Sequence, residues 1–194
     1  MELFADQGYG ATSIPDICTR AGLTKGAFYS NFASKEALFL QLLDRSWEQR
    51  AEWIRRAMPG GEVLADASEN LAQGSKPDVD RQWTLVSTEF SLHAIRHPDV
   101  AELLVEHELR VRSELAVLVA EGFEHANRLP TIPVNELARM IVAVTEGSDI
   151  QSLTDAAAGT DVHPNLGPRA VTALLLHFSV STGSGSSSNR VGSR

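Results

Sequence analysis

Cysteine and long apolar runs are the scarcest features of this sequence. A single cysteine, Cys18, among 194 residues excludes an intramolecular disulfide and a zinc site built from cysteines. The purest apolar runs, Met140–Val144 and Ala173–Leu176, are far shorter than the roughly 20 residues needed to cross a bilayer, and no charged-then-apolar leader opens the chain. With 43% hydrophobic residues, the chain is predicted to be a globular cytoplasmic protein that binds no membrane.

Enzyme signatures are missing too. The sequence has no Gly-x-Ser-x-Gly elbow, Walker loop, His-Glu-x-x-His pair or dinucleotide-binding glycines, so we expect no catalytic residues, no cofactor and no enzyme activity. His93 and His97, with His107 or Glu89, are a candidate metal set. The preferred alternative is histidines that suit the dipole at a helix end, and no metal site is predicted. Cys18 is interpreted as a small apolar residue in a helix–helix contact rather than a redox sensor.

Positive charge is also in short supply, because 17 Lys and Arg against 25 Asp and Glu give a net charge of −8. Its distribution is more informative than its sum. Residues 1–60 hold seven basic and seven acidic residues, so the whole deficit falls beyond them. Within 13–35 the balance is three basic residues to one acidic. An acidic body with a locally basic end is able to bind DNA if the body is held away from the phosphates.

Strand patterns are absent as well, since no stretch alternates apolar and polar residues with β-branched enrichment, and no Asn-Gly or Asp-Gly hairpin occurs. Apolar residues instead recur at helical spacing, so we predict an all-α fold of about nine helices. The longest apolar stripe predicts a helix over 34–58, which begins at the N-cap Ser34 and stops before Pro59. A break is expected at His97-Pro98, because the residue before proline avoids helical geometry. Further helices are predicted near 62–73, 79–97, 99–127, 134–157 and 168–179.

The last two predicted helices are apolar on more than one face, and such a helix must be covered on all sides. Because a chain of this size has few helices to bury these faces, we expect a partner subunit to cover them. The alternative is that each is a central core helix. The tail from Ser179, in which ten of 16 residues are Ser or Gly, is predicted to be flexible and to add nothing to the core. The predicted homodimer interface consists of Ile141, Val144, Leu174, Leu175 and Phe178.

Residues 13–32 have the pattern of a helix-turn-helix. Ser13 begins a capping box at the start of a short amphipathic helix. Gly22 ends that helix in the left-handed conformation that glycine allows. Leu23 is expected to fill the corner, and Thr24 to cap the second helix.

The second helix of this pair divides into two faces. Phe28 and Phe32 lie four residues apart and are predicted to face inward, whereas Lys25, Tyr29 and Ser30 face outward. Lysine suits a phosphate or a guanine edge in the major groove, and hydroxyls suit phosphates. The spacing alone leaves DNA binding and a plain tight turn between helices about equally favoured.

A wider similarity rests on three stretches, Leu3–Ile14, Ala21–Tyr29 and Phe32–Leu38, which together resemble the DNA-binding head of the tetracycline-repressor (TetR) family. The resemblance covers residues 3–43 almost without a gap. It implies an all-α homodimer whose helix-turn-helix heads bind a palindromic operator in double-stranded DNA. By position, Tyr29 and Lys35 would contact phosphates, and Lys25 and Ala27 would contact bases. The family's DNA-contacting places fall on Ser13, Thr24, Lys25, Gly26, Ala27, Tyr29, Ser30 and Lys35.

The resemblance also implies a division of the chain into three parts. Residues 1–45 would be the DNA-binding head, 46–179 a helical domain for ligand binding and dimerisation, and 180–194 a flexible tail. The helical domain would bind an unidentified small-molecule effector, expected to be apolar because aromatic residues and methionine cluster there. Core packing is the alternative for each candidate pocket residue, and these are Trp83, Phe90, Phe123 and Met140.

Two features depart from the family pattern. Pro15 replaces a residue that is often polar or basic, and the sequence begins in the middle of the family's first helix. Because Met1–Gln7 can form only about two helical turns, which are marginal alone, we expect Ile17, Phe28 and Phe32 to be less well buried. The first hypothesis is a ligand-responsive transcriptional repressor, and the alternative is a helical small-molecule-binding dimer with impaired DNA binding.

Overall fold

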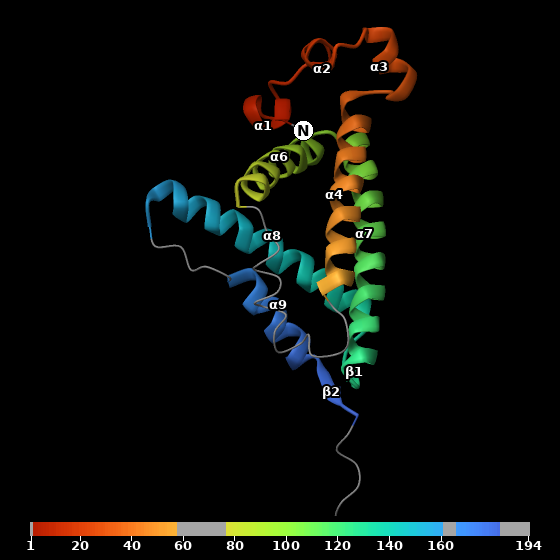
Figure 1. Ribbon diagram of the computed structural model, residues 1–194, viewed down its shortest axis with the longest axis vertical. Helices are drawn as coiled ribbons and strands as arrows, with labels where there is room; N and C mark the ends of the chain where they lie inside the picture. The colour runs from red at the N-terminus through yellow and green to blue at the C-terminus, as the bar shows by residue number, and fades with distance from the viewer. Residues whose placement is uncertain (1, 58–76, 161–165, 183–194) are drawn as a thin grey trace, which may run out of the picture.

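The computed structural model describes residues 2–57, 77–160 and 166–182, and within them the predicted all-α fold is confirmed (Figure 1). No helix in these ranges is both long and apolar enough to cross a bilayer. The helix predicted at 62–73 lies outside the described residues. The helices are α1 (Glu2–Gln7), α2 (Ile14–Ala21), α3 (Lys25–Asn31), α4 (Lys35–Ala57), α6 (Pro77–Arg96), α7 (Pro98–His125), α8 (Val134–Ala158) and α9 (Leu166–His177), and the strands are β1 (Arg128–Pro130) and β2 (Ser179–Ser181).

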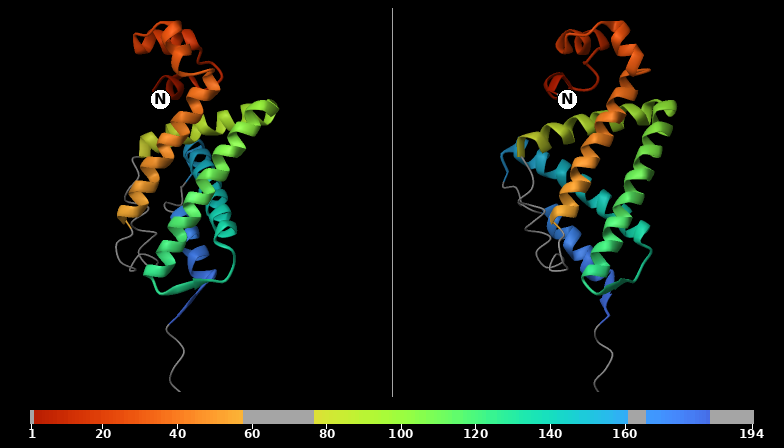
Figure 2. Two further views of the ribbon diagram at one scale, coloured as in Figure 1. Left: turned by 90° about the vertical axis from the view of Figure 1, so that its right-hand side faces the viewer. Right: turned by 45° about the vertical axis from the view of Figure 1, so that its right-hand side comes forward.

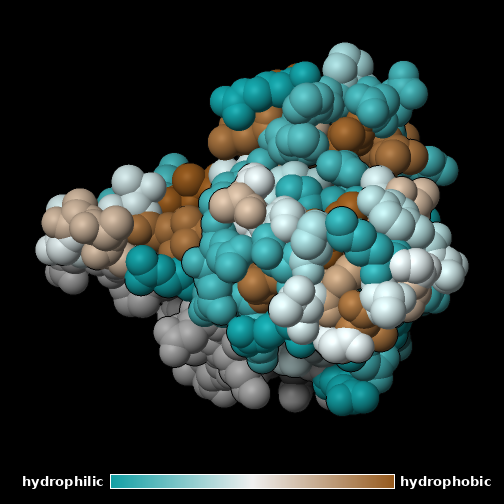
Figure 3. Space-filling view, turned by 90° about the horizontal axis from the view of Figure 1, so that it is seen from above, coloured by the Kyte–Doolittle hydropathy of each residue, from teal (hydrophilic) through white to brown (hydrophobic). Residues whose placement is uncertain are grey.

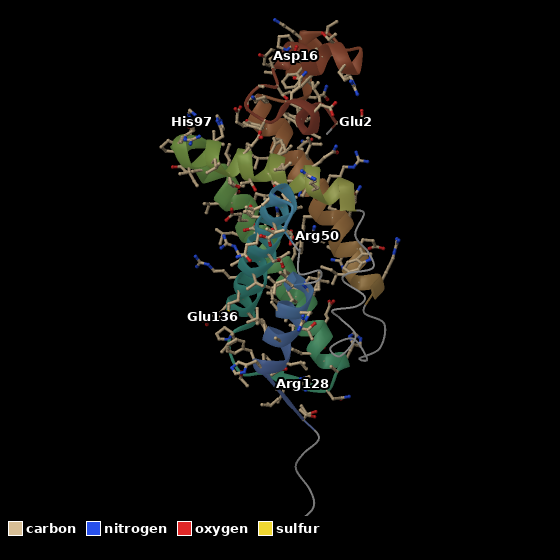
Figure 4. The ribbon with its side chains drawn as sticks, turned by 90° about the vertical axis from the view of Figure 1, so that its left-hand side faces the viewer. Glu2, Asp16, Arg50, His97, Arg128 and Glu136 are labelled. Atoms are coloured by element: carbon tan, nitrogen blue, oxygen red, sulfur yellow. The ribbon has the colours of Figure 1, made fainter. Side chains whose placement is uncertain are left out.

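The helices form a small head on a larger body. Helices α2 and α3 lie at one end of the molecule, and α4 runs from them into the body alongside α7 (Figures 1 and 2). Helix α6 crosses below the head, and α1 packs against it (Figure 1). Helices α8 and α9 pack side by side at the other end of the body (Figure 4). The long helix α4 therefore belongs to both parts.

Local signals set the ends of the long helices. Ser34 accepts a hydrogen bond from the backbone N–H of Ala37 at 3.1 Å and so caps α4, as predicted. His97 has an extended backbone with φ −130° and separates α6 from α7, because Pro98 follows it. These local signals fix where α4 begins and where the chain changes direction between α6 and α7.

Two hydrophobic clusters form the core. We call the first the junction cluster, because it joins α1 and the following turn to α4, α6 and α7. The second, the lower cluster, joins α7, α8 and α9. The buried members of the junction cluster are Phe4, Tyr9, Phe39, Val86, Phe90, Ala94, Val100 and Leu104. Those of the lower cluster are Leu115, Ala116, Val119, Phe123, Leu137, Ala138, Ile141, Val171 and Leu175.

Polar contacts connect α4 to α7 between these clusters. Asp44 Oδ1 lies 2.7 Å from Nδ1 of the buried His107, and Arg110 donates to the same oxygen at 2.9 Å. One turn further along α4, the indole N–H of Trp47 donates to Glu114 at 2.5 Å. The body therefore holds α4 by polar contacts as well as by apolar packing.

The prediction that the chain has no strands is wrong for two short segments. β1 and β2 pair antiparallel with Leu129 opposite Val180, and Arg128 Nε donates to Ser179 Oγ at 2.7 Å. Ser179 is 4% exposed, so the tail does contribute to the core at its first residue. Three residues are too few to show an alternating pattern. Residues 183–194 lie outside the described part of the chain.

Candidate nucleic-acid interface

Capping interactions build the bend between α2 and α3. Ser13 Oγ accepts from the backbone N–H of Asp16 at 3.3 Å, and the Asp16 carboxylate accepts from the Ser13 N–H at 3.2 Å, which completes a capping box. Gly22 ends α2 with φ 65°, in the left-handed region. Thr24 then caps α3 by accepting from the backbone N–H of Ala27 at 3.1 Å. This local geometry is a helix-turn-helix.

Helix α3 has a buried face and an outward face. Phe28 is buried, with its ring centroid 5.5 Å from that of the partly buried Phe32, so the expected poor burial of Phe28 is not observed. Tyr29 is 56% exposed. Leu23 is 54% exposed, so the expectation that it fills the corner is wrong. The exposed residues of the outward face are Lys25, Gly26, Tyr29 and Ser30.

Viewed from above, side chains at the head end of the molecule are mostly hydrophilic or weakly polar, with isolated hydrophobic ones among them (Figure 3). A surface that contacts phosphates and base edges needs donors and small residues rather than a continuous apolar patch. The outward face of α3 is of this kind, and α2 and α3 form one end of the molecule (Figure 1).

An open groove runs beside this outward face. It is lined by residues 10–14 on one side and by Tyr29 and residues 33–36 on the other. The first turn of α4 opens into it, and backbone N–H groups at a helix N-terminus favour an anion. A backbone phosphate in the groove would meet Lys35 and these N–H groups, and also the carboxylate of Glu36.

Lys35 is partly buried rather than free on the surface. Its Nζ donates to the backbone carbonyl oxygens of Tyr9 at 2.8 Å and Thr12 at 2.9 Å, and it lies 4.3 Å from the centroid of the Tyr9 ring. Burial lowers the pKa of its ammonium. Two of its three N–H donors are thus used inside the head, and one remains for the groove that Lys35 lines.

Tyr9 is a residue whose role the sequence pattern missed. It is buried, and its hydroxyl donates to Glu36 Oε1 at 3.0 Å. Burial, together with this hydrogen bond, raises the pKa of the phenol. Burial also acts to raise the pKa of Glu36, but hydrogen bonds from its own backbone, Ser34 and Tyr9 outweigh this effect and lower it. Only the Gly8-Tyr9-Gly10 run, which indicates a turn, signals this position in the sequence.

Both parts of the chain match known families of proteins. Residues 1–42 match the family model of bacterial regulatory proteins of the tetR family, and residues 70–176 match that of the C-terminal domain of BetI-type transcriptional repressors. The chain belongs to the TetR family. Proteins of this family regulate transcription and are not enzymes, so the chain is a TetR-type transcriptional regulator with a DNA-binding helix-turn-helix.

Relatives and solved structures agree with this assignment. The transcriptional regulator UidR of Escherichia coli K12 is 22% identical over 153 residues, which cover 78% of this chain and 77% of UidR. Salmonella enterica GusR has the same fold, with a TM-score of 0.67 and 21% identity over 90% of each chain. A protein from Saccharomonospora viridis, solved in complex with choline, has a TM-score of 0.62 and 20% identity over 92% of each chain.

The structure does not bring together the four residues predicted to line an effector pocket of this TetR regulator. Trp83 and Phe90 both contact Phe39 of α4, with ring centroids 6.1 Å and 4.6 Å away, and so lie at the junction cluster. Phe123 belongs to the lower cluster, and Met140 is partly buried on α8. The seven-residue spacing placed Trp83 and Phe90 on one face correctly, but contained no information about α7 and α8.

Two of the five residues predicted for a dimer interface need correction, and the other three stay a prediction. Ile141 and Leu175 are buried inside the lower cluster of their own subunit. Leu174 and Phe178 are partly buried and pack against it, and Val144 is partly buried on α8. On a helix that is apolar all round, the sequence does not distinguish the inner face from the outer one. The large apolar residues of α8 and α9 that remain exposed are Ile150, Leu166 and Leu176.

The candidate metal ligands do not form a site in the described ranges. The rings of His93 and His97 lie 4.2 Å apart, centroid to centroid, while His107 is buried against Asp44. No group of three His, Cys, Asp or Glu residues among those described is arranged to hold a metal ion. Cys18 is buried in α2, as a structural residue would be.

Proposed function

We propose that this TetR-family regulator is a cytoplasmic repressor that binds a palindromic operator as a homodimer and is released by a small-molecule effector. The observation that carries the proposal is the outward face of α3. Lys25, Tyr29 and Ser30 are exposed on α3, which lies at one end of the molecule (Figure 1), while the buried Phe28 anchors the helix from behind. A short helix that is held in this way fits a major groove.

Each polar group of the head has a proposed role at the duplex. Lys25 and Ala27 read base edges, and Gly26 lets the helix backbone approach closely. Tyr29 donates to a phosphate, and the third N–H of Lys35 reaches a phosphate in the groove. The Ser30 hydroxyl donates to the Gly26 carbonyl at 2.8 Å in the structure and would turn from it to a phosphate. Ser13 and Thr24 hold the N-termini of α2 and α3, whose backbone N–H groups also suit phosphates.

The proposed division of labour follows α4. Residues 1–45 read DNA, and 46–179 bind the effector and the second subunit, with α4 shared between them. Trp83 and Phe90 at the junction cluster are the apolar candidates for sensing an effector. Choline is bound by a protein of similar fold, so a small organic cation is the second effector class to test.

The proposed dimer places α8 and α9 against their symmetry mates, which is the isologous arrangement that most homodimers use. Both helices lie together on one side of the molecule (Figure 4). On α9, the exposed residues Leu166, Arg169, Ala173 and Leu176 recur at helical spacing, so they form one stripe opposite the buried Gly167, Val171 and Leu175.

The proposal is tested by selecting bound duplexes from a random DNA library and measuring affinity for the selected sequence by fluorescence anisotropy. We expect a palindrome. Lys25→Ala and Tyr29→Ala should each weaken binding by about tenfold or more, and Lys25→Ala should also relax sequence preference. Arg81→Ala, which removes an exposed cation from the body, is the matched control and should change affinity less than about twofold.

Two outcomes would contradict this proposal. Failure to enrich any duplex would favour the alternative of an effector-binding helical dimer without DNA binding. Unaltered affinity in both head variants would refute the placement of α3. Titrating the complex with choline and with apolar aromatic compounds, while following DNA release and tryptophan fluorescence, then separates the two effector classes.

A further inference from the structure

Tyr9 lies where the head meets the body. Its side chain is 1% exposed and belongs to the junction cluster. Its ring centroid lies 5.8 Å from that of Phe4 in α1, 5.2 Å from that of Phe39 in α4 and 5.0 Å from that of Phe90 in α6. A residue packed against three helices from both parts of the molecule fixes their relative placement.

Every polar atom of Tyr9 forms a hydrogen bond with a charged side chain. Its carbonyl oxygen accepts from Lys35 Nζ at 2.8 Å, and its hydroxyl donates to Glu36 at 3.0 Å. Its backbone N–H donates to Glu89 Oε2 at 2.5 Å. Lys35 and Glu36 begin α4, next to the head, whereas Glu89 reaches Tyr9 from the middle of α6. Of these three charged contacts, the one with Glu89 ties the turn to α6.

The turn fits closely against this carboxylate. Gly8 has φ 81°, and a Cβ added there would lie 2.7 Å from Glu89 Oε2. Because a carboxylate that accepts from a backbone N–H makes a short and strong hydrogen bond, a displacement of α6 at Glu89 must displace the turn or break the bond.

Little free chain separates this turn from the DNA-reading helices. Thr12 is buried, and its hydroxyl donates to the Gly8 carbonyl at 2.7 Å. Lys35 bridges the carbonyls of Tyr9 and Thr12. The capping box of α2 begins at the next residue, Ser13. The turn at Tyr9 and the start of α2 are therefore connected by a segment that hydrogen bonds hold in place.

We propose that Glu89 is a positioning residue for operator recognition: by holding the Tyr9 N–H, it sets the orientation of α2 and α3 relative to α6. Glu89 touches no DNA in this proposal. Its effect on DNA rests on the proposed function, since two heads of a dimer must be oriented together to occupy both halves of a palindrome. Its effect on the Tyr9 turn is independent of the proposed function.

The test compares Glu89→Ala and Glu89→Gln with wild type on two duplexes, the selected full palindrome and a duplex that carries one half-site. Glu89→Ala should weaken binding to the palindrome by about tenfold and to the half-site by less than about twofold, because each head stays folded. Glu89→Gln keeps a neutral acceptor and should lose only about threefold on the palindrome. Glu102→Ala, an exposed carboxylate of α7, is the matched control and should match wild type.

Amide hydrogen exchange supplies a readout that needs no DNA. The Tyr9 amide should be protected in wild type and Glu102→Ala, partly protected in Glu89→Gln, and fast-exchanging in Glu89→Ala. An equal loss of affinity on both duplexes, or unchanged Tyr9 exchange in Glu89→Ala, would overturn the inference. If wild type binds no duplex, the proposed function fails, and the exchange rates still decide whether Glu89 holds the turn.

Discussion

At the scale of single residues, the environment of Tyr9 makes the junction sensitive to alkaline pH. Burial and the hydrogen bond to Glu36 raise the pKa of its phenol in the folded protein. The unfolded chain has the ordinary tyrosine pKa of about 10. Below that pH the stabilisation is fully present. Above it, the unfolded state loses the proton first, so the free energy of unfolding falls as the pH rises.

The two tyrosines of the chain allow a clean measurement of this effect. In Tyr29→Phe, Tyr9 is the remaining tyrosine. We expect little phenolate absorbance near 295 nm at pH values just above 10, and a rise only together with the loss of helical circular dichroism. Tyr9→Phe, which leaves the exposed Tyr29, is the control for an accessible phenol. A phenolate signal from Tyr9 in a fully folded protein would contradict the burial of its hydroxyl.

At the scale of elements, the bend between α2 and α3 depends on a single backbone conformation. Gly22 has φ 65°, where a side chain costs about 1–2 kcal/mol. Gly22→Ala should therefore lower the free energy of unfolding by about 1 kcal/mol in urea titrations. Gly10→Ala is the matched control, because Gly10 does not have a positive φ and a Cβ there meets no atom within 4 Å. Equal stabilities of the two variants would contradict the left-handed cap.

The contact between α4 and α7 depends on Asp44. Asp44→Ala leaves the buried His107 without its partner and frees Arg110, so stability should fall by about 1–3 kcal/mol. The lower end of this range is expected, because Asp44 is itself 38% exposed and solvent screens its charge. Glu48→Ala, an exposed carboxylate one turn further along α4, should change the urea midpoint little. A similar loss in both variants would show that the contact with His107 contributes nothing specific.

The sequence predicts those elements whose ends are determined locally. Ser13, Gly22 and Thr24 act on residues within one turn of themselves, so their caps follow from spacing. Lys35 differs, because its carbonyl partners lie 26 and 23 residues earlier in the chain. Only the tertiary fold brings them within hydrogen-bond distance of its ammonium. The resemblance accordingly gave Lys35 a phosphate contact alone, whereas the structure has it partly buried in the head.

At the scale of the whole molecule, the same distinction separates what the sequence predicts from what it does not. Helical spacing gives the body its helices, but Phe90 and Phe123 lie in different clusters because α6 and α7 diverge from their corner (Figure 2). Ile141 and Leu175 likewise lie in the lower cluster of their own subunit, because α7, α8 and α9 pack together there. Periodicity defines a face, and tertiary packing decides what covers it.

The charge distribution also acts at this scale. The net charge of −8 arises beyond residue 60, and residues 1–60, which include the head, are neutral overall. A body that repels phosphates lowers non-specific affinity, so under the proposed function binding depends on the contacts of α3. For a transcriptional regulator with many competing sites, this property favours specific sites over bulk DNA.

The exposed stripe of α9 leads to the last prediction, which concerns the second subunit. Leu176 is 42% exposed on α9, on the face opposite the residues that fill the lower cluster. If this face pairs with its symmetry mate, Leu176→Asp puts two carboxylates into an apolar contact and should give monomers with unchanged helical content. Leu174→Asp is a poorer test, because Leu174 packs against its own core.

Leu23→Asp, on a leucine that is 54% exposed in the head, is the matched control and should keep the mass of a dimer. Multi-angle light scattering of the three proteins decides the question, since a dimeric Leu176→Asp would place the interface elsewhere.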